Sequence, residues 1–498
     1  MSNAAPPTAS LVGVVAAVVI AGALTHPAEA FLVNGRWAFT ATDGVTDPEG
    51  EPVTLTWSIV PDGTPISSLG QTPSSLVSFL DSLWGFGDGG VDYEQRPWFG
   101  FVESSFTRWS EVSGVVLEYE PADDGLNGRA HGQWLGLNGV RGDLRLGGGP
   151  IDGPDGTLAE AGFIPNSDIT LDVSDAGHFG NPAPGDTYRN LLNTLTHEVG
   201  HSLGLGHPIS PNAEFLMESR FNGSLDGPQY DDIRGVQRLY GDTLERNGGN
   251  DTDATASDLG IVSPGVAAVF GADGDSGVAL SLDQNDFLSI SNASDVDYLE
   301  FTLLEPATMD LVLTPVGPTY NEFTLADGVV DIVTAAQNDL TLELYEAGPA
   351  GLSLVAASDA AGLGEAESIL DISAEAGSYV ARIAGAGDAL QLYMLSIDTA
   401  AAAVLSAGDF NDDGVVDAAD YTVWRDNFGA SDDSALLFRG DGSPGIDGDD
   451  YAVWAQNLGV SYSGGAIDLI PAPEPATAVT LLFGAAAVIC SRGRRTGV

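Results

Sequence analysis

Cysteine and lysine are nearly absent from this sequence of 498 residues. The one cysteine is Cys490, near the C-terminus, so no disulfide can form within the chain. Every basic residue is an arginine, and 17 arginines face 71 aspartates and glutamates, which gives a net charge of -54. Such an acidic chain repels nucleic acid phosphates, so nucleic acid is excluded as a partner. Hydrophobic cores and bound metal ions must hold the folds together, and the acidic surplus suits calcium binding and solubility in salty water.

Histidine is also scarce, with six in the chain, yet His197, His201 and His207 fall within eleven positions. His197 and His201 are four residues apart, so on a helix they lie on one face and can bind one metal ion. Gly204 can adopt a positive φ, end the helix and let the chain turn back, which brings His207 to the same ion. Three imidazoles leave a fourth position for water, the pattern of a catalytic zinc.

Glu198 follows the first histidine, where a zinc peptidase carries its general base. Met217 follows ten residues after His207. The extended pattern resembles the metzincin signature H-E-x-x-H-x-x-G-x-x-H followed by a Met-turn, which implies that Met217 lies beneath the metal. The plainer alternative is a helix that carries histidines by chance, with Met217 as an ordinary core residue.

The surrounding residues resemble the matrixin branch of the metzincins, the family of the matrix metalloproteinases, over about residues 50–243. Three stretches carry this resemblance: LTWSIV, DGPDGTLAEA and DDIRGVQRLYG. The resemblance implies an α+β catalytic domain over 31–243 and a peptide substrate lying extended along Thr157–Ala161. The loop Glu218–Gln229 does not resemble the usual continuation, so cleavage specificity is not carried over. No cysteine precedes the zinc motif, so a cysteine-switch propeptide is excluded.

Residue patterns predict the elements of this region. Strands are expected at Val53–Val60, Val115–Tyr119, Asp143–Leu146 and Ile169–Val173, and helices at Phe99–Val112, Arg189–Leu203 and Tyr230–Tyr240.

The same resemblance implies a calcium loop after Ile151. The expected ligands are carboxylates of Asp152, Asp172 and Asp175 with carbonyls of Gly153, Asp155 and Thr157, which are hard oxygen donors suited to calcium. A metal-free turn rich in aspartate and glycine is the alternative.

The matrixin family usually carries a second, structural zinc. Glu160 and Thr170 stand where that site needs histidines. We therefore expect one catalytic zinc and no structural one. His131 and His178 are expected to be surface residues in polar loops.

Residues 252–398 show short strands separated by turn residues, which predicts a β-sandwich after a linker at 245–251. The stretches SDVDYLEFTL, NDLTLELYEAG and GSYVARIAGAG resemble the bacterial pre-peptidase C-terminal domain. The sandwich either binds substrate or matrix, or acts as a spacer. The strands expected are Tyr298–Leu304, Thr308–Thr314, Leu340–Tyr345, Ser378–Ile383 and Ala389–Ile397.

Residues 408–459 contain a sequence repeat, DYTVW at Asp420 and DYAVW at Asp450, thirty residues apart. The first copy ends a loop with the spacing of an EF-hand calcium site, so the segment resembles a small α-helical, EF-hand-like dockerin module. The ligands expected there are Asp409, Asn411, Asp413, Val415 through its carbonyl, Asp417 and Asp420. The second loop is degraded, because Arg439 takes the first ligand position and Pro444 the glycine position.

Both ends of the chain predict export. Residues 1–30 combine an apolar run with Ala28-Glu29-Ala30, a small-x-small cleavage site, and read as a signal peptide; a buried helix is the alternative. Residues 473–498 resemble a PEP-CTERM sorting tail, with a plain membrane anchor as the alternative. We expect a protein at the cell surface or outside the cell, held transiently at the membrane by its C-terminal tail.

The sequence thus predicts a multidomain zinc endopeptidase with one Zn²⁺ and bound Ca²⁺, acting on protein or peptide substrates. An extracellular polysaccharide or a cohesin-like protein is a further candidate partner. One alternative is a calcium-dependent adhesin with a relic peptidase domain, which protein without bound zinc would favour. Another is a polysaccharide-processing enzyme, for which the sequence offers no persuasive carboxylate pair.

Overall fold

The computed structural model describes residues 31–461, except 89, 91, 128–134, 181–187, 212, 247, 276–278, 325–327, 402–406 and 442. The expected signal peptide and sorting tail, together with His131 and Cys490, lie outside the described residues. Backbone contacts divide the chain into two units, residues 1–402 and 403–498. Among the described residues, no helix has both the length and the apolar character needed to cross a membrane.

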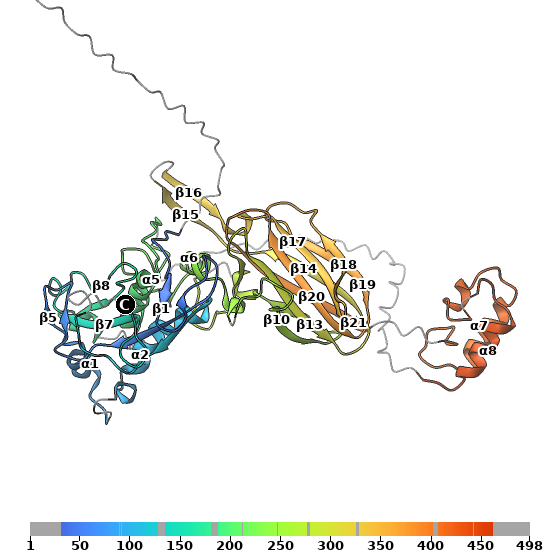
Figure 1. Cartoon of the computed structure of the whole chain (residues 1–498). Coiled ribbons are helices and arrows are strands. Elements are labelled where there is room, and N and C mark those ends of the chain that lie inside the picture. The colour runs from blue at the N-terminus through green and yellow to red at the C-terminus, as the bar shows by residue number, and fades with distance from the viewer. Residues whose placement is uncertain are drawn as a thin grey trace, which may run out of the picture. The chain divides into compact units, whose positions relative to one another are not determined.

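The first unit contains a mixed five-stranded sheet in the order β6-β3-β7-β9-β8. Figure 1 shows β8 of this sheet beside α5 (Arg189–Ser202). Its strands are β3 (Val53–Ile59), β6 (Val115–Tyr119), β7 (Leu144–Gly149), β8 (Ala159–Ala161) and β9 (Ile169–Asp172). The inner pairs are parallel, and β8 joins β9 antiparallel at the edge. The central strands β3 and β7 are buried along almost their whole length, as expected for a sheet covered on both faces.

Helices complete this α+β region. They are α1 (Leu76–Trp84), α2 (Phe99–Glu111), α4 (Ala176–Phe179), α5 (Arg189–Ser202) and α6 (Tyr230–Tyr240). The ring of Trp57 on β3 stacks on Phe106 of α2 with centroids 4.2 Å apart. Trp109 of α2 donates its indole N–H to the carbonyl of Thr196 in α5 at 2.8 Å, which ties the two helices together. The strands and helices predicted here are confirmed within a few residues, whereas α1 was not predicted.

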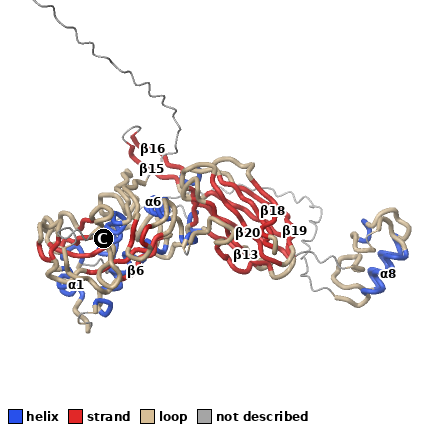
Figure 2. The backbone as a smooth tube through the Cα atoms, viewed as in Figure 1, coloured by secondary structure: helices blue, strands red, loops and turns tan. Residues whose placement is uncertain are grey.

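Two further sheets share one apolar core in the second half of the unit. One has the order β10-β13-β20-β17-β18, and the other has β11-β21-β14-β19 with β12 also paired to β21. Burial alternates strictly along β13 and β14, so one face of each sheet points into the shared core. Figure 2 shows that strands replace the mixture of helix and strand seen earlier in the chain.

The remaining elements are short or belong to these sheets, except β15 and β16, which pair with each other in a separate two-stranded sheet. The longer strands are β10 (Ser257–Val262), β13 (Val296–Leu303), β14 (Ala307–Pro315), β15 (Thr319–Thr324), β16 (Gly328–Val333), β17 (Leu340–Gly348), β18 (Gly351–Ser358), β19 (Glu367–Ala374), β20 (Gly377–Gly385) and β21 (Gln391–Ala401). The short strands are β1 (Phe39–Thr40), β2 (Gly44–Val45), β4 (Pro65–Ile66), β5 (Thr72–Pro73), β11 (Ala268–Phe270) and β12 (Leu288–Ile290). The 3-10 helices are η1 (Tyr93–Gln95), η2 (Thr243–Glu245), η3 (Ala272–Asp275), η4 (Thr334–Ala336) and η5 (Ser434–Leu436).

A continuous interface joins the α+β region to the later sheets. Gln237 of α6 donates to the carbonyls of Val112 at 2.8 Å and Phe287 at 3.1 Å, one on each side. The segment 245–251, expected to be a linker, is packed into this interface, with Glu245 only 2% exposed and Asn250 fully buried. The burial of this segment could not be predicted from its turn-rich composition, because the groups that cover it come from distant parts of the chain.

The second unit contains two short helices, α7 (Ala418–Asn427) and α8 (Gly448–Asn457), related by the sequence repeat. Each begins with a capping box, at Asp417 and Asp447. Trp424 of α7 donates its indole N–H to the carbonyl of Asp447, and Trp454 of α8 donates to that of Asp417, both at 2.7 Å. The two tryptophans therefore cross-link the helices symmetrically, and both half-buried rings pack against the core formed by Phe410, Leu436 and Ile446.

Candidate metal centre

Three histidine side chains meet at one point beside α5. His197 and His201 lie on one face of the helix, and His207 returns to them from the loop that follows. The Nε2 atom of His207 lies 3.1 Å from Nε2 of His197 and 2.8 Å from Nε2 of His201. Two nitrogens bound to one tetrahedral zinc ion would be roughly 3.4 Å apart. The donor set is thus spaced for a single metal ion.

Backbone carbonyls fix the orientation of the two helical histidines. Nδ1 of His197 lies 2.6 Å from the carbonyl of Leu216, and Nδ1 of His201 lies 2.8 Å from that of Leu205. A carbonyl can only accept, so each Nδ1 carries the proton and donates it. This tautomer leaves the Nε2 lone pairs free toward the common point, as metal-binding histidines require.

Gly204 makes the turn that returns His207, as its position in the sequence predicted. Its φ is 104°, and a Cβ there would lie 2.0 Å from the carbonyl oxygen of Gly35. The N-terminal end of the described chain lies against this turn. The N–H of Asn34 donates to the carbonyl of Gly204, and the N–H of Gly206 donates to the carbonyl of Leu32, both at 2.6 Å. Only glycine permits both this conformation and this approach.

Met217 packs beneath the helix that carries the histidines. It is 1% exposed, and a Cβ on Gly200 would meet its sulfur at 2.3 Å. The preceding carbonyl, that of Leu216, is the acceptor for His197. Asp232, at the start of α6, accepts the backbone N–H groups of Leu216 at 2.8 Å and Met217 at 3.0 Å. A buried carboxylate therefore holds the turn that orients His197.

The electrostatic surroundings suit neutral imidazoles. Burial lowers the pKa of His197 to about 3 and that of His201 to about 4, and it also lowers the pKa of His207. Neutral histidines can bind a metal without first losing a proton. Burial, assisted by the charge of Glu160, raises the pKa of Glu198 to about 8, while a hydrogen bond from the backbone of Ala161 opposes the shift.

A cleft of about 870 Å³ opens over these residues. The three histidines and Glu198 line its floor, and the edge strand β8 lines one wall. Leu216 and the loop residues Glu218, Ser219, Phe221 and Asn222 line another part, so the loop after Met217 shapes the cleft. Because β9 pairs with only one side of β8, the other side is available to an extended chain.

Comparison with known proteins agrees with this geometry. Residues 94–241 match the matrixin peptidase family. The matrixin region is 37% identical over 160 residues to human (Homo sapiens) matrix metalloproteinase-20, covering 31% of this chain and 28% of that protein. It is 41% identical over 98 residues to human matrilysin, covering 18% of this chain and 34% of that protein. The chain thus spans about a third or less of the length of these curated relatives.

One solved structure shows a much weaker likeness. A crystal structure of the pre-peptidase C-terminal domain of a collagenase from Bacillus anthracis aligns with 29% of this chain and 94% of its own. The sequence identity is 12% and the TM-score is 0.17.

The predicted calcium ligands of the matrixin region come together in one loop system. Asp152 accepts the N–H of Thr157 at 3.0 Å, and Asp155 donates its own N–H to Asp175 at 2.7 Å. Asp152 also donates to Asp172 at 3.3 Å. The second carboxylate oxygen of the buried Asp175 has no hydrogen-bond partner among the described residues. Gly153 bends the loop with φ at 99°.

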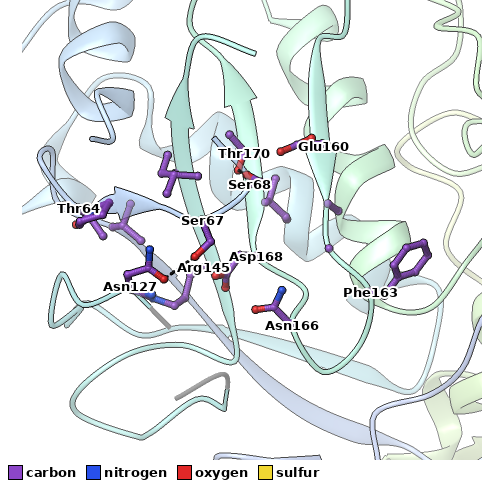
Figure 3. A pocket seen from close by; sticks show the side chains of 17 residues that line it. Thr64, Ser67, Ser68, Asn127, Arg145, Glu160, Phe163, Asn166, Asp168 and Thr170 are labelled. Atoms are coloured by element: carbon purple, nitrogen blue, oxygen red, sulfur yellow. Dashed lines mark hydrogen bonds between the residues drawn. The ribbon is translucent and has the colours of Figure 1, made fainter. Parts of the chain in front are cut away.

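A smaller cavity of about 200 Å³ lies where the family resemblance would place a second zinc (Figure 3). Glu160 and Thr170 line it together with Arg145, Asn127 and Asp168. Figure 3 shows these side chains around the strands, and its described lining contains no histidine. The expectation of a single zinc stays a prediction. The side chains that line this cavity offer oxygen donors, amides and a guanidinium.

His178 corrects one expectation. It is not a surface residue of a polar loop but lies half-buried in the short helix α4. Its ring packs edge-on against Phe179 and Phe221, with centroids 5.1 and 4.9 Å away. Burial lowers the pKa of His178. The apolar neighbour Phe221 is 43 positions later in the chain, so local sequence could not reveal this contact.

The second unit brings together part of each expected calcium loop. Carboxylate oxygens of Asp409, Asp413 and Asp420 lie within 4.8 Å of one another. In the same loop, Asn411 donates its side-chain amide to Asp413, Val415 donates its N–H to Asp413, and Asp417 caps α7. The degraded loop has a similar group, Asp433, Asp441 and Asp450, in which Asp433 was not foreseen. Arg439, at the lost ligand position, forms ion pairs with Asp409 and Asp412 of the first loop.

Proposed function

We propose that this protein is a zinc-dependent endopeptidase whose catalytic residue is Glu198. The observation that carries the proposal is the convergence of His197, His201 and His207 beside Glu198 on the floor of an open cleft. The match to the matrixin family supports it, although that match covers residues 94–241 alone.

The three imidazoles would hold the zinc ion through their Nε2 atoms. When bound, zinc supplies a Lewis acid for the scissile carbonyl and makes a water molecule easier to deprotonate. Glu198 would accept the proton of the attacking water and deliver it to the leaving amine. Its buried carboxylate, 6% exposed, keeps little contact with bulk water, which favours proton transfer to and from the substrate.

The peptide would lie antiparallel to β8 as an added strand. Backbone groups on the side of β8 (Ala159–Ala161) that faces away from β9 would provide main-chain hydrogen bonds, which give affinity without selecting particular side chains. The region between Phe221 and Leu225 would then contact the side chain nearest the zinc. Asn193 of α5 holds this region in place by donating to the carbonyl of Leu225 at 2.8 Å and accepting the N–H of Gly227 at 3.2 Å.

The test replaces Glu198 in the full-length chain. Glu198→Ala should retain one zinc ion per chain, since no metal ligand is lost, and should cleave casein at least 10²-fold more slowly. The measurements are zinc content by atomic absorption and release of casein fragments. Glu103→Ala, at an exposed glutamate of α2 that does not line the cleft, is the matched control and should keep full activity. Undiminished casein cleavage by Glu198→Ala would exclude the proposed mechanism.

Calcium is proposed as a structural cofactor. The loop containing Asp152, Asp172 and Asp175 and the dockerin-like loop beginning at Asp409 both present clustered oxygen donors. We further propose that the later sheets act as a pre-peptidase C-terminal-like β-sandwich and that 408–459 is a dockerin-like module. A cohesin-like protein or an extracellular polysaccharide would be their partner.

Export and sorting complete the proposal. Cleavage after residue 30 would release the chain outside the cell, and the tail 473–498 would anchor it at the membrane until it is cut. Mass spectrometry of the protein recovered from its own cells would test both cleavages.

A further inference from the structure

A second group of carboxylates lies far from the histidine site, inside the interface between the matrixin region and the later sheets. It is formed by Glu245 of η2 and by Asp295 and Asp297 at the start of β13. Their exposed fractions are 2%, 7% and 0%. Oxygens from all three lie within 4.8 Å of one another. Two oxygens on opposite sides of a calcium ion are at most about 5 Å apart, so this spacing fits one ion.

Each of these carboxylates uses one oxygen in the fold and leaves the other without a partner. Glu245 accepts the N–H of Asn250 at 3.3 Å, Asp295 that of Ser291 at 2.6 Å, and Asp297 the hydroxyl of Tyr393 at 2.5 Å. The second oxygens, Oε1 of Glu245 and Oδ1 of Asp295 and Asp297, are buried and accept no hydrogen bond among the described residues. Buried acceptors of this kind are costly unless a donor or a cation faces them.

Asn250 provides an independent indication of a ligand. Its side chain is fully buried and lies against the carboxyl of Asp297. The amide oxygen Oδ1 has no donor among the described residues. A buried amide oxygen without a donor is unfavourable in an empty site, whereas amide and carboxylate oxygens are ligands that calcium accepts together.

The cluster continues toward the surface through Glu51 and Asp251. These two and Glu245 form a second group with oxygens within 4.8 Å. A Cβ added to Gly249 would lie 3.5 Å from Oε2 of both Glu51 and Glu245 and 3.6 Å from Oδ2 of Asp251. A glycine thus leaves open the space onto which these oxygens converge.

No arginine neutralises the buried group. Every charge that acts strongly on Glu245 is another carboxylate, which together with burial raises its pKa. The nearest basic residue of this segment, Arg246, donates instead to the carbonyl of Ser113 at 2.7 Å. The negative charge is therefore uncompensated by the described part of the chain, and a divalent cation would compensate it.

We infer that Glu245, Asn250, Asp295 and Asp297 bind a calcium ion that fastens the later sheets to the matrixin region. The ligands are hard oxygen donors, as calcium prefers, and none is a histidine or thiolate that would favour zinc. Because β13 supplies two ligands and the segment after α6 supplies the others, the ion bridges the junction itself. This inference does not depend on peptidase activity.

Trypsin provides a local test, because Arg246 is the basic residue within the junction segment 245–251. The full-length chain is studied in the Glu198→Ala background, which prevents self-cleavage, in zinc-supplemented buffer with or without calcium. Calcium should slow cleavage after Arg246 at least tenfold, and it should have no effect in Glu245→Gln. Glu300→Gln, on the outward face of the same strand, is the matched control and should retain the protection.

Equilibrium dialysis with labelled calcium supplies a second readout. Glu245→Gln should bind one calcium fewer than the parent, whereas Glu300→Gln should bind the same number. If Glu245→Gln does not fold, as judged by circular dichroism, Asp297→Asn and the rim variant Asp251→Asn replace it, each expected to weaken the calcium protection at least tenfold. The inference would be overturned if calcium did not change the rate of cleavage after Arg246 in the parent, or if it protected all the cluster variants equally. The carboxyl groups would then share protons in place of a bound ion.

Discussion

At the scale of single residues, the histidine site depends on backbone groups as much as on its side chains. The convergence of the three histidines could be predicted because their spacing places them on one helix face and one returning loop. The acceptors that orient His197 and His201 are carbonyls of two leucines, which have no signature in a sequence. Asp232 was also missed, since its role emerges only when α6 packs against the Met217 turn. The adjacent acidic residues at the start of α6 were the available clue.

Gly204→Ala should damage this site without changing any ligand. The new Cβ would lie 2.0 Å from the carbonyl oxygen of Gly35, and the φ of 104° disfavours any side chain. We expect a loss of roughly 2–4 kcal/mol of unfolding free energy and weaker zinc retention. Urea unfolding and zinc content measure the two effects. Gly177→Ala, whose Cβ would meet no atom within 4 Å, should change neither.

At the scale of elements, the hairpin β15–β16 reaches the loop that carries His207. Phe323 of β15 donates its N–H to the carbonyl of Ile209 at 2.8 Å, two residues after that histidine. Tyr320 packs edge-on against Phe215, with centroids 4.8 Å apart, and donates its hydroxyl to Asp231 of α6 at 2.6 Å. The sequence did not predict this hairpin, because its strands pair mainly with each other and their apolar residues were assigned to no sheet.

Tyr320→Phe should therefore loosen the metal site from a distance. It removes the hydroxyl that donates to Asp231 and accepts from Arg234 at 2.8 Å, which should cost about 1–3 kcal/mol because both groups are buried. Zinc transfer to a chelating dye should become several-fold faster. The matched change is Tyr345→Phe, whose hydroxyl bonds Glu343 within the sheets and should leave zinc transfer unaltered. Equal rates in the two variants would show that the hairpin does not support the site.

At the scale of the whole molecule, the net charge is -54, and some of the carboxylates gather in groups of three. Composition indicated an acidic protein suited to binding calcium, and the motifs predicted two candidate calcium loops. The junction cluster, made of Glu51, Glu245, Asn250, Asp251, Asp295 and Asp297, was not predicted, because its members come from three separate segments of the chain. No local pattern links such distant positions, and the segment that joins them has the composition of a turn.

The junction cluster predicts an unusual dependence of stability on pH. Burial is the main cause that raises the pKa of Glu51 and Asp295 to about 7 and that of Asp242 to about 6. Unfolded, these groups release their protons near pH 4 to 4.5, so the folded state holds more protons between there and about pH 7. Without calcium, the unfolding free energy should therefore fall as the pH rises through this window.

Urea unfolding followed by tryptophan fluorescence at several pH values would measure this slope. The lowered pKa values of the histidines act in the opposite direction, because unfolding lets them gain protons in acid. The informative quantity is the difference between the parent and Glu245→Gln, which share those histidines. A variant slope as steep as that of the parent would contradict the assignment to the carboxylates.

The crossed tryptophans of α7 and α8 bear on how the repeated segment can evolve. Each indole closes the start of the opposite helix, so neither half completes its own fold. If one copy loses the acidic residues of its loop, its tryptophan is still needed to cap the helix of the other copy. Selection would then preserve DYAVW after the preceding loop had lost its metal ligands. Deletion of one helix alone would be selected against, because the other helix would lose its cap.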